Sequence, residues 1–282
     1  MKPLDFSIVV PVFNAAPYVE RCAEALVSQG YPEDRYEILM ADNNSTDGSA
    51  EIIRKFPRIK LLHEAEQSSY AARNRALREA RGEIAAFTDP DCVPTSDWLE
   101  RIAQAMAEPS TGIVMGDRRF ANDSGVLGLL AAYESELGER IFTRKGANYY
   151  YAYTNNMAVR MPLLRETGGF LTVKRGGDAL FMRGVVAKYG EGILKYEPRM
   201  LVRHLEIAGI RDYLDKKRIY GQTNGKPALA TPSALSLGER LSVALKARRV
   251  CRGSLADSAG FACVLAAGAL SFEWQRIKGG GR

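Results

Sequence analysis

The chain has 282 residues, of which 46% are hydrophobic and 26% charged, and its formal net charge is +6 at pH 7. A chain of this length and composition can bury a large core, which excludes wholesale disorder. The four cysteines show no C-x-x-C spacing and there are only two histidines, which argues against a zinc cluster or a disulfide framework and agrees with a reducing compartment.

The positive charge is concentrated near the end of the sequence. Residues 240–282 contain eight Lys and Arg against two Asp and Glu, a balance that equals the whole net charge. The preceding part is therefore close to neutral, which argues for a basic tail and against a nucleic-acid-binding protein. The sequence begins with a strand-like run and no signal-peptide pattern, so we expect a cytoplasmic protein.

The first part of the sequence alternates apolar runs with segments of helical periodicity. The expected strands are 6–13, 36–42, 59–64, 82–89 and 112–117, and the expected helices start at Pro17 and cover 49–56, 69–80 and 98–106. Continuous apolar strands that alternate with helices predict an α/β fold whose mainly parallel sheet is covered by helices on both faces.

After residue 117 the alternation becomes irregular. Helices are expected at 126–142, 178–189 and 210–221 and strands at 149–160 and 195–204, before a stretch rich in Pro, Ala and Ser, 225–236, that is typical of a linker. We therefore expect a main domain over 1–225, with halves 1–117 and 118–225, and a helical tail over 226–282. Within the tail, the apolar run 260–272 is too short to span a bilayer.

Polar residues follow the predicted strands at their carboxyl ends, where ligands bind in sheets of this kind. They are Asn14, Asp42, Glu64, Asp89 and Asp91. The last two belong to FTDPDCV, residues 87–93, and two carboxylates at a strand end suggest a divalent metal.

The same stretch also satisfies the D-x-D-x-[TV] motif of haloacid-dehalogenase-like phosphohydrolases, in which the first Asp attacks phosphate. That motif ordinarily sits on the first strand, whereas three strand–helix units precede Asp89 here. No later G-D-x-x-x-D pair follows either, because Ala179, Leu180, Phe181 and Met182 come after Gly177-Asp178. The phosphohydrolase is therefore the weaker alternative.

Six motifs in a fixed order point to a different family. They are VVPVFN, ADNNSTDGS, AARNRALREARGEIAAFTDPDC, NNMAVR with a later GGF, GGD before a helix, and VRH before a basic helix. In these motifs the chain resembles inverting family 2 glycosyltransferases. The resemblance implies a GT-A (Rossmann-like) fold, with a nucleotide-sugar-binding half, a small acceptor-side half and, here, a helical C-terminal appendage.

The resemblance also assigns roles to individual residues. It places the donor nucleotide-sugar against Pro11, Asn14, Asp42, Asn44, Arg73, Asp89 and Asp91. It assigns a divalent metal, Mn2+ or Mg2+, to Asp91 and His204. For Arg73 the alternative is a surface arginine, and for His204 it is a structural histidine.

An inverting transfer needs a base to deprotonate the acceptor hydroxyl. The family usually has Glu-Asp at the start of the helix after GGF, and that Asp is the base. Here Gly177 stands in place of the Glu, and Asp178 is the candidate base. The alternative is that Asp178 is only the N-cap of its helix.

The resemblance predicts one sugar moved from a nucleotide-sugar, with a UDP-sugar favoured, to a glycan or lipid-linked acceptor in cell-envelope polysaccharide biosynthesis. A processive synthase is less favoured because the sequence shows neither transmembrane helices nor Q-x-x-R-W. A nucleotidyltransferase is less favoured because a Gly-rich basic loop near the N-terminus is absent, and a non-catalytic nucleotide-sugar-binding module stays as an alternative. Residues 238–251 carry Leu241, Ala244 and Leu245 on one side, as interfacial helices do. We therefore expect peripheral contact with anionic membrane, or else packing of this helix on the domain.

Overall fold

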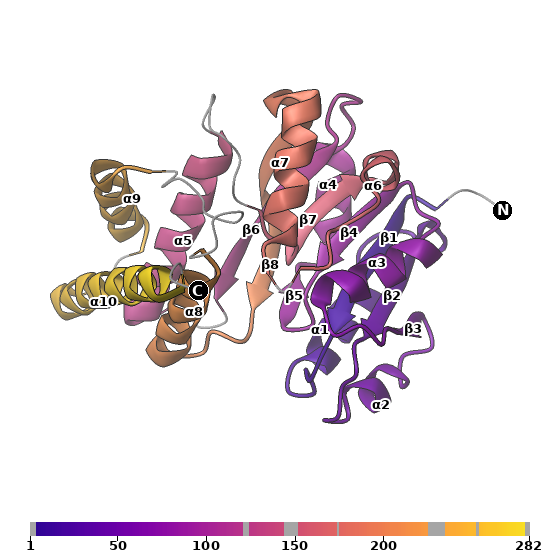
Figure 1. Ribbon diagram of the computed structural model, residues 1–282, viewed down its shortest axis with the longest axis horizontal. Helices are drawn as coiled ribbons and strands as arrows, with labels where there is room; N and C mark the ends of the chain where they lie inside the picture. The colour runs from indigo at the N-terminus through magenta and orange to yellow at the C-terminus, as the bar shows by residue number, and fades with distance from the viewer. Residues whose placement is uncertain are drawn as a thin grey trace. The chain divides into compact units, whose positions relative to one another are not determined.

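The computed structural model describes residues 4–120, 124–143, 152–173, 175–224, 235–251 and 254–279. The chain forms two compact units. The first comprises Met1–Arg118 and Tyr151–Arg203, and the second comprises Arg119–Tyr150 and His204–Arg282. Each unit therefore contains two separate stretches of sequence, as the colours of Figure 1 show.

The first unit is built on a sheet. Its strands are β1 (Phe6–Val12), β2 (Tyr36–Asp42), β3 (Ile59–His63), β4 (Ile84–Thr88), β5 (Cys92–Pro94), β6 (Ile113–Phe120), β7 (Asn156–Arg160) and β8 (Leu194–His204). Their order in the sheet is β3-β2-β1-β4-β7-β6-β8-β5. Strands β3, β2, β1 and β4 run parallel, whereas β7 is antiparallel to β4 and to β6.

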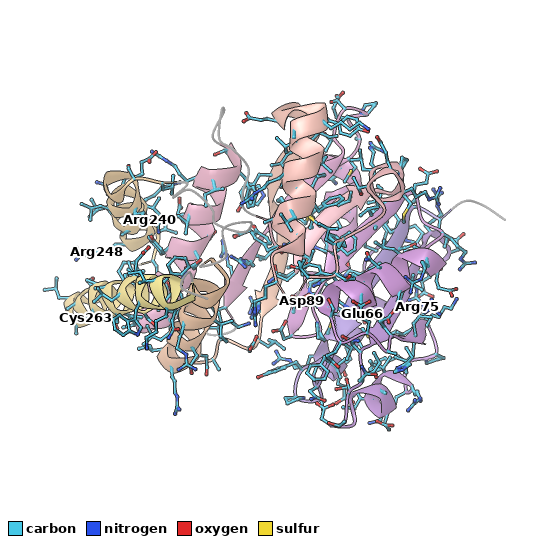
Figure 2. All side chains as sticks on the ribbon, viewed as in Figure 1. Glu66, Arg75, Asp89, Arg240, Arg248 and Cys263 are labelled. Atoms are coloured by element: carbon cyan, nitrogen blue, oxygen red, sulfur yellow. The ribbon has the colours of Figure 1, made fainter. Side chains whose placement is uncertain are left out.

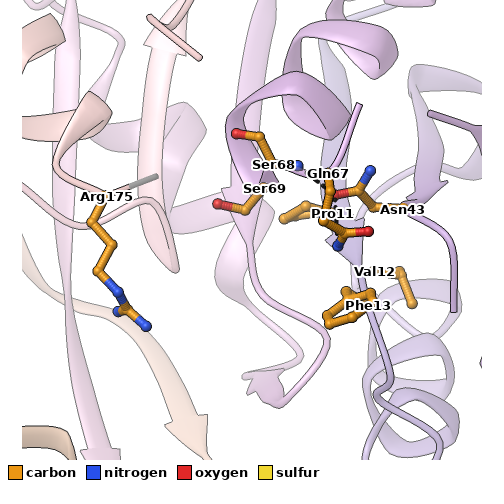
Figure 3. A pocket seen from close by; sticks show the side chains of 8 residues that line it. All are labelled: Pro11, Val12, Phe13, Asn43, Gln67, Ser68, Ser69 and Arg175. Atoms are coloured by element: carbon orange, nitrogen blue, oxygen red, sulfur yellow. Dashed lines mark hydrogen bonds between the residues drawn. The ribbon is translucent and has the colours of Figure 1, made fainter. Parts of the chain in front are cut away.

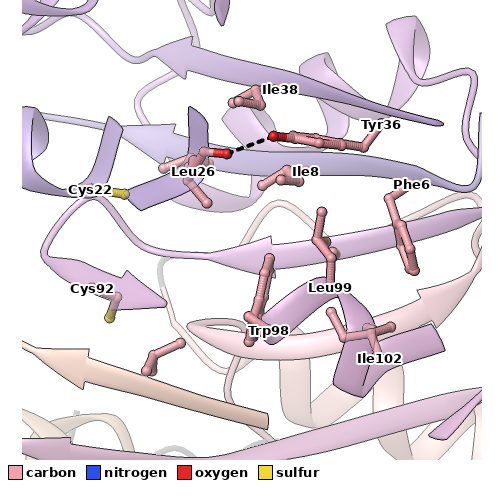
Figure 4. Packing of buried hydrophobic residues seen from close by; sticks show 14 of the residues in the cluster. Phe6, Ile8, Cys22, Leu26, Tyr36, Ile38, Cys92, Trp98, Leu99 and Ile102 are labelled. Atoms are coloured by element: carbon pink, nitrogen blue, oxygen red, sulfur yellow. Dashed lines mark hydrogen bonds between the residues drawn. The ribbon is translucent and has the colours of Figure 1, made fainter. Parts of the chain in front are cut away.

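The helices of this unit cover both faces of the sheet, as predicted. They are α1 (Val19–Val27), α2 (Ser49–Ile53), α3 (Ser69–Glu79), α4 (Trp98–Ala105), α6 (Met161–Thr167) and α7 (Gly177–Tyr189), with 3-10 turns η1 (Glu33–Arg35) and η2 (Glu191–Ile193). Strand β1 is buried at every position. Phe6 and Ile8 pack with Leu26 of α1 and Trp98 of α4 on one face, whereas Val9 is buried without joining that cluster (Figure 4).

The register of the parallel strands explains where the site lies. Val12 pairs with Asp42, and Asp42 pairs with His63, so β1, β2 and β3 end at the same level. Apolar side chains fill the strand interiors, and polar residues begin where the strands stop. This edge carries the loops that hold the predicted donor-binding residues.

Strand β7 is shorter than the sequence suggests, since the predicted strand 149–160 pairs only from Asn156 onward. Residues 149–151 lie outside the described residues. The Asn156 amide is fully buried, accepts from the Trp98 indole N–H at 2.8 Å and donates to the carbonyls of Asp117 at 2.5 Å and Met200 at 2.7 Å. Asn156 is therefore a cross-link within the sheet.

The second unit is helical in its described part. Its helices are α5 (Gly125–Thr143), α8 (Ile210–Asn224), α9 (Leu237–Val250) and α10 (Leu255–Gly279). Most of the predicted linker, 225–234, lies outside the described residues. Helix α9 packs Val243 and Ala247 inward but exposes Leu241 and Leu245. Figure 2 labels Arg240 and Arg248 on α9 and Cys263 on α10.

Helix α10 is longer than the apolar run that the sequence suggests. Its segment Leu255–Gln275 is long and apolar enough to cross a membrane by length and composition, and only 17% of the most apolar window is buried. The expectation that this region is too short to span a bilayer is therefore wrong, because the helix continues on both sides of the thirteen-residue apolar run 260–272.

Candidate active site

The turn after β2 contains a carboxylate oxygen that can still accept a hydrogen bond. Asp42 is buried, and its Oδ2 accepts from the backbone N–H of Ser45 at 3.3 Å. Its Oδ1 is buried and has no hydrogen-bond partner among the described residues. A buried acceptor without a partner is unfavourable unless a ligand supplies a donor, so Asp42 is suited to bind an N–H group.

Two predicted donor-binding residues, Asn14 and Asn44, shape the neighbouring loops. Both adopt a positive φ, 46° and 67°, which Asn tolerates better than most residues. The Asn14 side chain accepts from the Thr46 N–H at 2.9 Å, and the Asn44 amide donates to the Ala65 carbonyl at 2.9 Å. These bonds fix the loops that follow β1, β2 and β3.

A pocket of about 290 Å³ lies beside these loops (Figure 3). It is lined by Pro11, Val12, Phe13, Asn43, Gln67, Ser68, Ser69 and Arg175. Phe13 is 51% exposed although it follows an entirely buried strand. Sequence reasoning missed Phe13, and an aromatic residue directly after the end of an apolar strand was the available signal.

Asp89 and Arg73 form an ion pair. Arg73 Nη2 lies 2.5 Å from Asp89 Oδ1, and the Arg73 side chain is nearly inaccessible, whereas Asp89 is partly exposed. The alternative of a surface arginine is therefore wrong. Arg73 Nε is buried and has no partner among the described residues, and the guanidinium carbon lies 5.5 Å from the centre of the Tyr70 ring.

Asp91 lies between Asp89 and β5, partly buried. Its Oδ1 accepts from the Cys92 thiol at 3.5 Å. Burial, together with the charges of Asp91 and Asp89, raises the pKa of the Cys92 thiol and of the Cys22 thiol. The two thiols therefore stay neutral, and the two carboxylates create a negative potential at this turn that would favour a cation.

His204 is the last residue of β8, and it is buried. Strand β8 is the neighbour of β5 in the sheet, and the Thr95 N–H donates to the Leu201 carbonyl at 3.0 Å. The boundary between the two units falls directly before His204. Its role as a metal ligand stays a prediction from the sequence.

Asp178 is the second residue of α7. Gly176 is the N-cap of that helix, so the alternative in which Asp178 is only an N-cap is wrong. Asp178 Oδ1 accepts from the Tyr70 hydroxyl at 3.0 Å and from the Ala179 N–H at 2.9 Å. Burial raises the pKa of Asp178, and these hydrogen bonds and the charge of Arg73 lower it by less. A carboxylate with a raised pKa is a stronger base than an exposed one.

Asn155 is a further candidate residue of the active site. It precedes β7, and its backbone carbonyl accepts from the Thr88 hydroxyl at 3.0 Å. Its Oδ1 is buried without a partner among the described residues, unlike the amide of Asn156. The sequence does not distinguish Asn155 from Asn156. In the structure, the Asn156 side chain makes cross-linking hydrogen bonds, whereas Asn155 Oδ1 has no partner among the described residues.

Residues 7–168 match the family model of glycosyl transferase family 2. The chain belongs to this family. The match covers more than half of the chain and includes the loops after β1, β2 and β3, Arg73 and both aspartates of the Asp-x-Asp turn. The phosphohydrolase alternative has no support from it.

Characterised relatives of this glycosyltransferase chain are themselves glycosyltransferases. Glycosyltransferase AglE of Haloferax volcanii is 35% identical over 183 residues, which cover 61% of this chain and 58% of that protein. The dolichyl N-acetyl-alpha-D-glucosaminyl phosphate 3-beta-D-2,3-diacetamido-2,3-dideoxy-beta-D-glucuronosyltransferase of Methanococcus voltae is 25% identical over 78% of this chain and 72% of that protein. The chain thus spans little more than half the length of the Haloferax relative.

The fold agrees with that of a solved mannosyltransferase. The mannosyltransferase PcManGT from Pyrobaculum calidifontis, in complex with GDP-Man and Mn2+, matches with a TM-score of 0.66 and 22% identity, covering 97% of this chain and 90% of that chain. The predicted GT-A fold, a mixed α/β sheet flanked by helices, is thereby confirmed.

Proposed function

We propose that this chain is an inverting glycosyltransferase that moves one sugar from a nucleotide-sugar to a hydroxyl acceptor by direct displacement. The acceptor hydroxyl gives its proton to the Asp178 carboxylate while its oxygen attacks the anomeric carbon. The bond from that carbon to the diphosphate oxygen breaks on the opposite face, and the nucleoside diphosphate leaves.

One observation carries this proposal. A single line of contacts runs from the Asp-x-Asp turn to the candidate base: Asp89 binds Arg73, the Arg73 guanidinium lies over the Tyr70 ring, and the Tyr70 hydroxyl donates to Asp178. Asp178 on α7 therefore lies close to the residues expected to hold the donor, which supports its proposed role as the base. This proximity is what a direct displacement requires.

The nucleotide is proposed to occupy the pocket beside β1 and β2. Asp42 Oδ1 would accept a hydrogen bond from an N–H of the base, which would satisfy its buried oxygen. Pro11 and the exposed ring of Phe13 offer an apolar wall against which a base can stack. The donor is proposed to be a UDP-sugar, and GDP- and dTDP-sugars are the comparison.

The residues at the Asp-x-Asp turn fit a divalent metal, because Mg2+ and Mn2+ prefer carboxylate oxygens and two carboxylates meet there. Asp91 is the proposed ligand, together with His204 as predicted from the sequence alone. A bound Mn2+ or Mg2+ would neutralise charge on the diphosphate as the nucleotide leaves. Asp89 stays fixed by Arg73 and keeps that arginine oriented.

The test is a nucleotide-release assay with UDP-, GDP- and dTDP-sugars in Mn2+ or Mg2+. Asp91→Asn is expected to abolish metal-dependent release. Asp178→Asn is expected to remove transfer while nucleotide binding, measured by calorimetry, is retained. Asp34→Asn, an exposed aspartate in η1, is the matched control. Full activity of either site variant would refute its role, and binding without turnover by the unaltered protein would favour a non-catalytic module.

The acceptor is proposed to be lipid-linked, and the second unit to rest on the cytoplasmic face of an anionic membrane. Leu241 and Leu245 of α9 are 62% and 54% exposed, and Leu270 and Trp274 of α10 are 73% and 60% exposed. Arginines accompany the exposed leucines on α9, as in interfacial helices. The Methanococcus relative, whose name includes a dolichyl-linked sugar phosphate, supports an acceptor of this class.

Vesicle sedimentation tests this contact. Leu241→Ser combined with Leu245→Ser should lower partitioning to phosphatidylglycerol vesicles by about tenfold or more, since each buried leucine contributes about 1.5–3 kcal/mol. Leu171→Ser is the control, because Leu171 is also 62% exposed but belongs to the first unit. Equal partitioning of both variants and the unaltered protein would refute the contact.

A further inference from the structure

We infer that Tyr70 is a positioning residue for Asp178, and that Gly177 is required because the Tyr70 ring occupies the space beside it. The inference rests on the proposed role of Asp178 as the base. It names a residue on α3, outside the segment that carries the base, and it explains why the usual Glu-Asp pair is Gly-Asp in this chain.

The Tyr70 side chain is held in one orientation. It is 6% exposed, its ring centre lies 5.9 Å from that of Phe170, and the Arg73 guanidinium carbon lies 5.5 Å from the ring centre. Its hydroxyl donates to Asp178 Oδ1 at 3.0 Å across a sequence separation of 108 residues. Because Phe170 and Arg73 both contact the Tyr70 ring, its hydroxyl can hold the carboxylate in one rotamer, which a freely rotating donor could not do.

Gly177 is where the two segments meet. A Cβ added to Gly177 would lie 3.0 Å and 3.1 Å from the ring atoms Cε2 and Cδ1 of Tyr70, and 2.9 Å from the Leu171 carbonyl oxygen. A residue with a Cβ at this position would crowd the Tyr70 ring and the Leu171 carbonyl, so one of them would have to shift. The acid that usually precedes the base is thus replaced by an aromatic hydroxyl that reaches the base from another helix.

The hydroxyl remains a donor across the working pH range, because burial and the charge of Asp178 raise the pKa of Tyr70. The charged and titratable groups that face Asp178 are Arg73 and Tyr70, both from α3, and the Ala179 N–H of its own helix also donates to it. The hydrogen bond from Tyr70 favours the charged carboxylate and so lowers the pKa of Asp178. Together with the Ala179 N–H and the charge of Arg73, Tyr70 therefore shifts Asp178 toward its ionised form.

The first test is independent of turnover. Carboxyl carbons of aspartate are labelled with 13C and titrated by NMR in the full chain, and the signal missing from Asp178→Asn identifies Asp178. Tyr70→Phe keeps the ring and removes the hydroxyl, so the Asp178 titration is expected to move to higher pH. Tyr31→Phe is the matched control, because it removes a tyrosine hydroxyl that donates to Asp5 at 2.7 Å. An unmoved Asp178 titration in Tyr70→Phe would overturn the inference.

The second test uses the pH dependence of nucleotide release with whichever UDP-, GDP- or dTDP-sugar supports release. Tyr70→Phe is expected to lower the rate about tenfold on the acidic limb, with a smaller change on the plateau, because one hydrogen bond to a charged group is lost. A uniform loss at every pH would show that the hydroxyl does not act through the ionisation of Asp178, and an unchanged profile would show that only the ring matters; either result would overturn the inference. The proposed function fails separately, when Asp178→Asn retains full transfer.

Discussion

The close contact between Gly177 and Tyr70 predicts a specific response to Gly177→Ala. The added Cβ would lie 2.9 Å from a backbone oxygen, a distance that real Cβ atoms essentially never show, and 3.0 Å from an aromatic carbon, which is tighter than nine in ten real Cβ contacts. Overpacking of this kind costs about 1–3 kcal/mol. Gly177 is the first residue of α7, so little helix propensity offsets the cost.

Urea denaturation measures this effect, with fluorescence of the fully buried Trp98 as the probe of the first unit. The midpoint of Gly177→Ala should fall by about 0.5–1 M. Gly184→Ala, in the same helix, is the matched control. A Cβ at Gly184 meets nothing within 4 Å, so this variant should gain about 0.5–1 kcal/mol from helix propensity.

The opposite signs of the two alanine variants separate crowding from the general effect of removing a glycine. Gly177→Ala should also lower nucleotide release, because the Tyr70 ring must move away from its hydrogen bond to Asp178. Equal midpoints for Gly177→Ala and Gly184→Ala would refute the argument that Tyr70 fills this space.

Three further predictions concern single side chains. Asp42→Ala should weaken UDP or GDP binding by about tenfold or more at a small cost in stability, since Oδ1 has no partner among the described residues and Oδ2 accepts only the long bond from the Ser45 N–H; unchanged calorimetric affinity would contradict its proposed role. Burial raises the pKa of Asp178, so stability falls as pH rises from the ordinary value to the raised one. Asp178→Asn should therefore raise the free energy of unfolding at pH 7 and have no such effect at acidic pH, and denaturation at both pH values checks the sign. Trp98→Phe should cost about 2–4 kcal/mol by circular dichroism, because it leaves a cavity and a buried Asn156 Oδ1 without its donor; a loss below about 1 kcal/mol would exclude the cross-link.

The regular strands and helices could be predicted because the local pattern of apolar and polar residues determines them. The apolar strand 36–42 was predicted with the bounds that β2 has, and the periodic helix 98–106 differs from α4 by one residue. Strand β5 has only three residues, too few for a period to show. The tyrosine-rich run before Asn156 resembles a strand, but pairing with β4 begins only at Asn156, which long-range register decides.

The residues of the candidate site likewise fall into those that the sequence predicts and those that it does not. Asp42, Asp89, Asp91 and Asp178 could be selected because each follows a strand or opens a helix in a recognisable motif. Their partners could not be selected from the sequence, since the contact from Tyr70 to Asp178 joins residues 108 positions apart. The local sign of that contact in the sequence is Gly177, which stands where the family usually has a glutamate.

The division of each unit into two stretches of sequence has a consequence for synthesis and for truncation. Helix α5 leaves the ribosome well before residues 204–282, which supply Tyr213, Val243 and Phe261 to the core around Leu130. During that interval the apolar face of α5 is uncovered, and a chain shortened before α9 would lack Val243 and Phe261 and so leave part of that face uncovered permanently. Such a truncation would expose a surface prone to self-association, so the helical unit cannot be transferred to another protein as one continuous cassette.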